Sequence, residues 1–268
     1  MLMCACKASR LFRPANRTLP LIAVVQRFYA SNTSSRAPSV RLFDCCELEC
    51  DHPGPLPFGE LPFWRAELSR VALFVGDVSF DDVRNVQRAD LPRHIQRLCC
   101  PVMEVNGQLV SNTMQIALCS AHLASIQPAD EGQDSQVKRI LSASSALVSV
   151  IGSTGRLPEH GPDRAEALSR MCSPGGQLSE ALAAVEALCA ANAEACGRAV
   201  GSRLTVADLA IWRIAGGGLA TVRGVPSDFV ARSSPNVSAV LAAVEAEPKV
   251  QAWKALHPKY GGRDVYGF

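Results

Sequence analysis

The length and composition of the chain are those of a folded globular protein. Its 268 residues are 48% hydrophobic and 19% charged, which suits one sizeable core or two small ones and excludes disordered and fibrous proteins. The longest apolar run near the N-terminus, residues 19–25, is far shorter than the roughly 20 residues of a membrane-spanning helix. We therefore expect no membrane span.

The formal net charge of +2 hides an uneven distribution. Six basic residues precede residue 40, and the first acidic residue is Asp44. Without those six, 21 basic residues face 25 acidic ones, a net charge of −4. Such a balance argues against a nucleic-acid partner or an anionic membrane surface.

Residues 1–39 are predicted to be a targeting peptide. The segment contains Arg and Ser, lacks acidic residues and has apolar positions between its basic ones, which is typical of the cationic amphipathic helix of a mitochondrial import peptide. Arg27-Phe28-Tyr29 before Ala30 and Ser31 is typical of a mitochondrial processing site. The expected location is the mitochondrion, on the matrix side. A disordered basic tail, a secretory signal and a chloroplast address are the alternatives.

The cysteines favour a reducing compartment. There are 11 of them, an odd number, and two pairs are adjacent, Cys45-Cys46 and Cys99-Cys100. Vicinal cysteines rarely bridge to each other, so a disulfide framework is not expected. The spacing of Cys45, Cys46, Cys50 and His52 matches no common zinc motif, and we expect no metal.

Both strands and helices are predicted up to about residue 126, and only helices beyond it. Up to there we expect a strand over 40–46, a loop over 51–62, a helix over 63–75, a strand over 78–86, a hairpin over 101–110 and a helix over 112–123. In the 63–75 helix, Arg65, Glu67 and Arg70 are predicted to lie between the apolar positions that face the core. After residues 126–132 only helices are expected, at about 135–151, 177–196, 206–220 and 236–254.

This order predicts an α/β domain over 40–126, an all-α domain over 133–256 and a C-terminal tail over 257–268. Within the second domain, Thr205 as N-cap and Asp208 three residues later predict a capping box. These two residues are therefore expected to be structural, with the cap contributing about 1 kcal/mol.

Several local sequences resemble the glutathione S-transferase superfamily, and its sigma-class-like members in particular. Residues 65–73 and 76–84 resemble the first helix and second strand, residues 101–107 the third strand with its cis-proline, and residues 205–209 the start of a buried helix. The resemblance covers about residues 41–254. It implies a thioredoxin-like N-terminal domain followed by the all-helical C-terminal domain of that superfamily.

The resemblance also implies a glutathione site. In the family, the backbone of the residue before the cis-proline pairs with the extended tripeptide, which here implicates Cys100 and Pro101. A Gln-Ser pair holds the γ-glutamyl carboxylate at the start of the next helix, and Asn112-Thr113 matches that pair. The alternative is that Asn112 or Thr113 only caps this helix.

Two positions depart from the family pattern. The thiol-activating Tyr, Ser or Cys at the end of the first strand is matched by the segment Asp44-Cys45-Cys46, so Cys45 and Cys46 are the candidate catalytic residues. The family's Asp-Trp-Pro is Asp90-Leu91-Pro92, which lacks the indole N–H. The cations Arg93, His94 and Arg97 either replace that donor or form a solvated basic face.

We therefore expect a transferase-like protein that uses glutathione as co-substrate, without a metal. It would conjugate glutathione to a small electrophile, or exchange it with a protein thiol or disulfide. The alternative is a family member that has lost catalysis and serves as a structural or assembly subunit of a mitochondrial complex. The resemblance implies a homodimer, and the alternative implies a larger assembly.

Overall fold

The computed structural model describes residues 37–45, 66–86, 88–96, 98, 100–154, 157, 161–193, 197–220 and 222–256. The contacts divide the chain into Met1–Ala37 and Pro38–Phe268, and every described helix and strand belongs to the second unit. The expected targeting peptide up to residue 36, the expected 51–62 loop, Cys46 and the tail over 257–268 lie outside the described residues.

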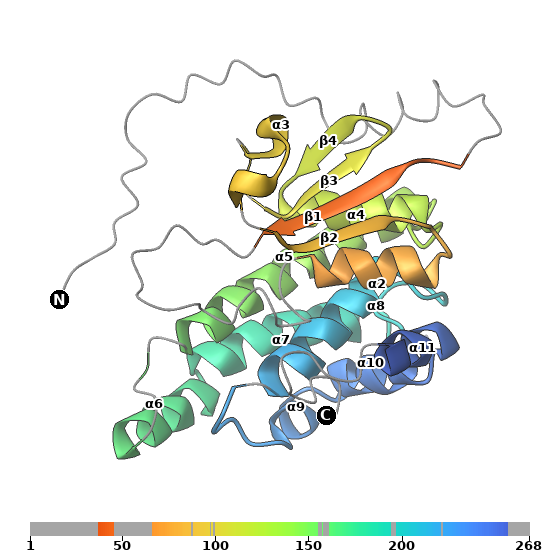
Figure 1. Cartoon of the computed structure of the whole chain (residues 1–268). Helices are drawn as coiled ribbons and strands as arrows, with labels where there is room; N and C mark the ends of the chain where they lie inside the picture. Colours follow the sequence, from red (N-terminus) through yellow and green to blue (C-terminus); the bar gives the residue numbers. More distant parts are fainter. Residues whose placement is uncertain are drawn as a thin grey trace. The chain divides into compact units, whose positions relative to one another are not determined.

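Four strands form one mixed sheet in the order β2-β1-β3-β4 (Figure 1). They are β1 (Val40–Cys45), β2 (Asp81–Val86), β3 (Val102–Val105) and β4 (Gln108–Ser111). β1 pairs parallel with β2 and antiparallel with β3. The β3–β4 hairpin turns at Asn106 and Gly107, both at positive φ, as the Asn-Gly pair predicts.

The side chains of successive β1 residues point to opposite faces of the sheet. Phe43 packs with Leu91, Ile95 and Val102, in a core cluster that includes the short helix α3 (Arg93–Gln96). Asp44 reaches the opposite face, where it pairs with Arg70 of helix α2 (Glu67–Val75). α2 packs against α4 (Thr113–Leu123), so these two helices lie together on this face, whereas α3 lies on the Phe43 face.

The rest of the described chain is helical. Its helices are α5 (Glu131–Ser153), α6 (Pro162–Cys172), α7 (Gln177–Ala190), α8 (Val206–Ile211), α9 (Phe229–Ser233), α10 (Pro235–Glu245) and α11 (Pro248–Leu256) (Figure 1). All residues of α8 are buried, and α8 continues as a buried π-helical segment, Trp212–Gly218. α5 and α10 each pack against both α7 and α8, and α8 also contacts α2 and α4, which makes α8 the centre of these contacts.

The predicted helices agree in place and differ at their boundaries. The helix expected over 236–254 is two helices, because Pro248 cannot donate a backbone N–H and begins a new helix instead. α5 begins at Glu131 rather than near 135, because Asp130 accepts a 2.8 Å hydrogen bond from the Gln133 N–H and caps it. α3, α6 and α9 are not among the predicted elements.

The described residues carry neither a membrane-spanning helix nor a cluster of metal-ligating side chains. No helix among them has the length and apolarity needed to cross a membrane. No three His, Cys, Asp or Glu residues of the described ranges are grouped so that they could hold a metal ion.

Candidate functional site

The end of β1, where the thiol-activating residue is expected, carries an ion pair. Cys45 is the last residue of β1 and pairs with Val86, after a register shift that follows Asp44. The side chain of Cys45 and the whole of Cys46 lie outside the described residues. The side chain of Asp44 is described, and its Oδ2 lies 3.3 Å from Nη2 of Arg70.

Arg70 is the centre of a buried charge cluster. Its side chain is only 5% exposed, and it also contacts Asp82 (Nε to Oδ1, 2.9 Å) and Glu67 (Nη1 to Oε2, 3.4 Å). Arg84 in turn pairs with Asp82. Burial acts to lower the pKa of Arg70, but the charges of Glu67, Asp82 and Asp44 outweigh it and raise that pKa. The guanidinium is therefore a permanent cation that holds three carboxylates together.

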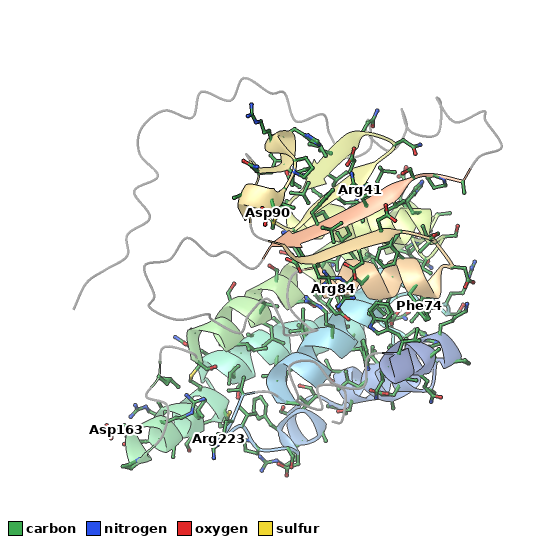
Figure 2. All side chains as sticks on the ribbon, in the orientation of Figure 1. Arg41, Phe74, Arg84, Asp90, Asp163 and Arg223 are labelled. Carbon is green, nitrogen blue, oxygen red and sulfur yellow. The ribbon has the colours of Figure 1, made fainter. Side chains whose placement is uncertain are left out.

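The same cluster connects α2 to the last helix of the bundle. Trp253 of α11 donates a 2.9 Å hydrogen bond from Nε1 to Oε1 of Glu67, whose side chain is 1% exposed. The Trp253 ring also packs on Phe74, with ring centroids 5.2 Å apart, and Figure 2 shows Phe74 on the side of α2 that faces α11. Lys249 of α11 pairs with Asp77.

Sequence reasoning missed this cluster, since it placed Glu67 and Arg70 between the buried positions of the helix. Both are buried. An available signal was their i, i+3 spacing with opposite charge on a helix that is otherwise apolar, a pattern in which two charges can be buried as a pair.

The peptide bond between Cys100 and Pro101 is cis, as the resemblance implies. Both residues are buried, and Cys100 belongs to the core cluster around Phe43. Pro101 directly precedes β3.

Asn112 and Thr113 stand at the start of α4. Asn112 has a φ of 81°, and its Oδ1 accepts hydrogen bonds from the N–H groups of Met114 (3.0 Å) and Gln115 (3.5 Å), so the capping interpretation holds for this side chain. Thr113 is half-buried, and its N–H donates to no acceptor among the described residues. One donor therefore remains at the positive end of α4.

Leu91 stands where the family has a tryptophan. It is 4% exposed and belongs to the core cluster with Phe43 and Ile95. Arg93 and His94 are exposed, and neither forms an ion pair with another described residue. The geometry favours the solvated basic face for these two cations, while Arg97 lies outside the described residues.

Thr205 and Asp208 form the expected capping box at the start of α8. Oδ2 of Asp208 accepts from the Thr205 N–H (2.7 Å) and from the Thr205 hydroxyl (2.8 Å). Its Oδ1 accepts from the Ala199 N–H at 2.7 Å. Burial raises the pKa of Asp208, against the lowering effect of these hydrogen bonds. The residue fixes both ends of the loop that precedes α8.

Comparisons with known proteins assign the architecture. Residues 167–257 match the family model described as glutathione S-transferase, C-terminal domain. The whole sequence matches none of the curated proteins. Among solved structures, a monomeric glutathione S-transferase of the hookworm Necator americanus is 18% identical with a TM-score of 0.61, and the alignment covers 83% of this chain and 99% of that one.

Two further solved structures are also similar to most of this chain. A sigma-class glutathione transferase of Fasciola hepatica is 16% identical with a TM-score of 0.61, over 83% of this chain and 98% of that chain. A prostaglandin synthase D of Nilaparvata lugens is 19% identical with a TM-score of 0.56, over 82% and 100%. The chain has the glutathione transferase fold, in which a thioredoxin-like region is followed by a helical C-terminal region.

Proposed function

We propose that the protein binds glutathione at Cys100, Pro101 and the start of α4, and transfers it to a small electrophile or exchanges it with a thiol or disulfide. Glutathione is the co-substrate in this proposal, and no metal takes part. The proposed location is the mitochondrion, from the targeting peptide expected over residues 1–39.

The observation that carries the proposal is the backbone N–H of Thr113. It lies at the N-terminus of an 11-residue helix, where the aligned peptide dipoles favour a negative charge, and it has no acceptor among the described residues. The γ-glutamyl carboxylate of glutathione would accept from this N–H and from the Thr113 hydroxyl. Asn112 contributes indirectly, because its cap holds the first turn in place.

The extended part of the tripeptide would pair with the backbone of Cys100, the residue before the cis-proline, as the resemblance to the family implies. In this proposal the glutathione thiol is activated by Cys45, the last residue of β1, or by Cys46, which follows it in the sequence. A cysteine there would support exchange through a mixed disulfide.

Calorimetric titration of glutathione into the full chain tests the binding step. We expect binding in the micromolar to low millimolar range, about tenfold or more weaker in Thr113→Val, which loses one hydrogen bond to a charged group. Thr113→Ser is the matched control, since it keeps the hydroxyl, and should bind as the parent does. Absence of heat at two temperatures, at each of which the protein is folded, would contradict the proposal.

The thiol step needs its own measurement. Deglutathionylation of a mixed-disulfide substrate should be lost when Cys45 and Cys46 are both replaced by Ser. Activity that survives in the double variant would show that neither cysteine carries the exchange.

A second candidate is a subunit that has lost catalysis and serves in a mitochondrial assembly. The specific observation in its favour is Asp44, because a carboxylate held by Arg70 at the end of β1 supplies no donor to stabilise a thiolate. An assay of glutathione binding together with turnover distinguishes the two candidate functions. A chain that binds glutathione but turns over neither a generic electrophile nor a mixed disulfide supports the second.

A further inference from the structure

A cavity of about 220 Å³ lies away from the proposed glutathione site. It is formed by the segment 125–129 between α4 and α5, the first turn of α5, and the loop 200–205 before α8. None of Cys100, Pro101, Asn112 and Thr113 lines it. The fold therefore offers a second concave surface with its own chemistry.

Arg203 is the only charged residue among the described residues that line this cavity. It is exposed and forms no ion pair with any other described residue. The carboxylates at the start of α5, Asp130, Glu131 and Asp134, do not line the cavity, and Asp134 pairs with Lys138. The charge in the described part of the wall is therefore the single positive charge of Arg203.

The same wall carries further hydrogen-bond donors. The backbone N–H groups of residues 201–204 donate to no acceptor within the described chain. Ser125, Ser202 and Gln133 add hydroxyl and amide groups to the wall. Gly201 has a φ of 60°, a backbone conformation that favours glycine, and it lies close to the Gln133 amide, since a Cβ placed there would be 3.1 Å from the amide oxygen.

Hydrogen bonds from Asn192 and to Asp208 hold the loop that carries these donors in place. Asn192 donates from Nδ2 to the Gly201 carbonyl and to the Arg198 carbonyl, both at 2.9 Å. Asp208 accepts from the N–H groups of Ala199 and Thr205 on either side. A preorganised loop loses little conformational freedom on binding a ligand, which favours affinity.

The wall also has an apolar part, beside the polar Gln127 and Thr205. Ile126, Pro128 and Leu204 are half-buried and Val200 is buried. The volume lies below the range of about 300–1,000 Å³ of pockets for drug-sized ligands, so the occupant must be small. An apolar body with one anionic group would match both parts of the wall.

We propose that this cavity binds a small organic anion, with its carboxylate or phosphate on Arg203 and the 201–204 backbone and its apolar body against Ile126, Pro128 and Leu204. Charge-assisted hydrogen bonds from a guanidinium and from backbone N–H groups are the standard means of holding either oxyanion. The proposal goes beyond glutathione binding and does not depend on it.

Calorimetric titration of the full chain with phenylacetate, phenyl phosphate and benzyl alcohol tests the proposal. The first two carry the alternative anions on one aromatic ring, and the third carries no charge. We expect phenylacetate or phenyl phosphate to bind with a dissociation constant of roughly 0.1–1 mM and benzyl alcohol to bind at least tenfold more weakly. The tighter of the two anions identifies whether the natural ligand is a carboxylate or a phosphate ester.

Two variants locate the binding. Arg203→Gln should weaken the anion at least tenfold, whereas Arg223→Gln, an exposed arginine near α6 outside the cavity (Figure 2), should leave it unchanged. Hydrogen exchange of the 200–205 amides should slow on binding. Thr113→Val should not alter the affinity for the anion, which separates this site from the proposed glutathione site.

Three results would overturn the proposal. They are the absence of binding by both anions at 10 mM, an equal loss of affinity in Arg203→Gln and Arg223→Gln, and slowed exchange elsewhere in the chain but not over residues 200–205. The last would show that the anions bind at another place, and equal losses would show general charge attraction.

Discussion

Replacement of Arg70 by Met should destabilise the protein far more than loss of an ordinary ion pair. The change keeps a long apolar stem but leaves Glu67, Asp44 and Asp82 without their shared cation, and these side chains are 1%, 14% and 21% exposed. Breaking a buried pair by removing one partner costs about 3–5 kcal/mol, because the remaining charge stays desolvated. Glu67 retains its bond from Trp253, which places the expected loss near 3 kcal/mol.

Urea unfolding followed by tryptophan fluorescence measures this loss, provided that the slope with denaturant is unchanged. The control is Arg170→Met, which breaks an i, i+4 pair with Glu166 whose side chains are both 69% exposed and should cost no more than about 0.5 kcal/mol. The loss caused by Arg70→Met should shrink in the double variant with Glu67→Gln, because the buried Glu67 charge is then removed as well. A loss below about 1 kcal/mol, or one that is the same with and without Glu67→Gln, would refute the account of a buried cation holding three carboxylates.

The remaining predictions concern one cap and three titrating groups. Asp208→Ala should cost about 2–4 kcal/mol of unfolding free energy in the same assay, because two buried N–H groups lose their acceptor, and a cost no larger than that of an exposed cap would contradict this. Burial raises the pKa of Cys119 to about 11 and that of Cys189 to about 12, so in peptide mapping after iodoacetamide treatment at pH 8 both should stay unmodified until urea is added. Burial lowers the pKa of His122, so the folded protein binds a proton there less readily than the unfolded chain, and stability should fall as the pH drops below about 6.5. That part of the pH dependence should vanish in His122→Gln, and its persistence there would assign it to other groups.

The parts of the fold that could be read from the sequence are those where one local signal dominates. Asn106-Gly107 between two apolar stretches predicts the β3–β4 hairpin, and Thr205 followed by Asp208 predicts the start of α8. α3 has four residues and α9 five, which is too short for a hydrophobic period to be recognised. Pro248 was the available signal for the break between α10 and α11, but the apolar pattern on both sides of it outweighed that signal.

The candidate site could be predicted only in part, for a physical reason. The cap by Asn112 is a local interaction, and the sequence already offered it as an alternative to ligand binding. The contact of Asp44 with Arg70 depends on the packing of α2 on the sheet, and the contact of Glu67 with Trp253 joins residues 186 positions apart. Such contacts follow from tertiary packing, which residue spacing alone does not reveal.

The hydrogen bond between Trp253 and Glu67 limits how the chain can be cut into fragments that fold separately. A fragment that ends near residue 126 would keep Glu67 and Phe74 but lose the indole that covers them, and it would expose an apolar ring beside a half-satisfied carboxylate. Such a fragment should be poorly soluble alone and recover when the complementary helical fragment is added. Exchange of either half with that of a relative would likewise succeed only where the incoming half brings a matching partner for Glu67 or for Trp253.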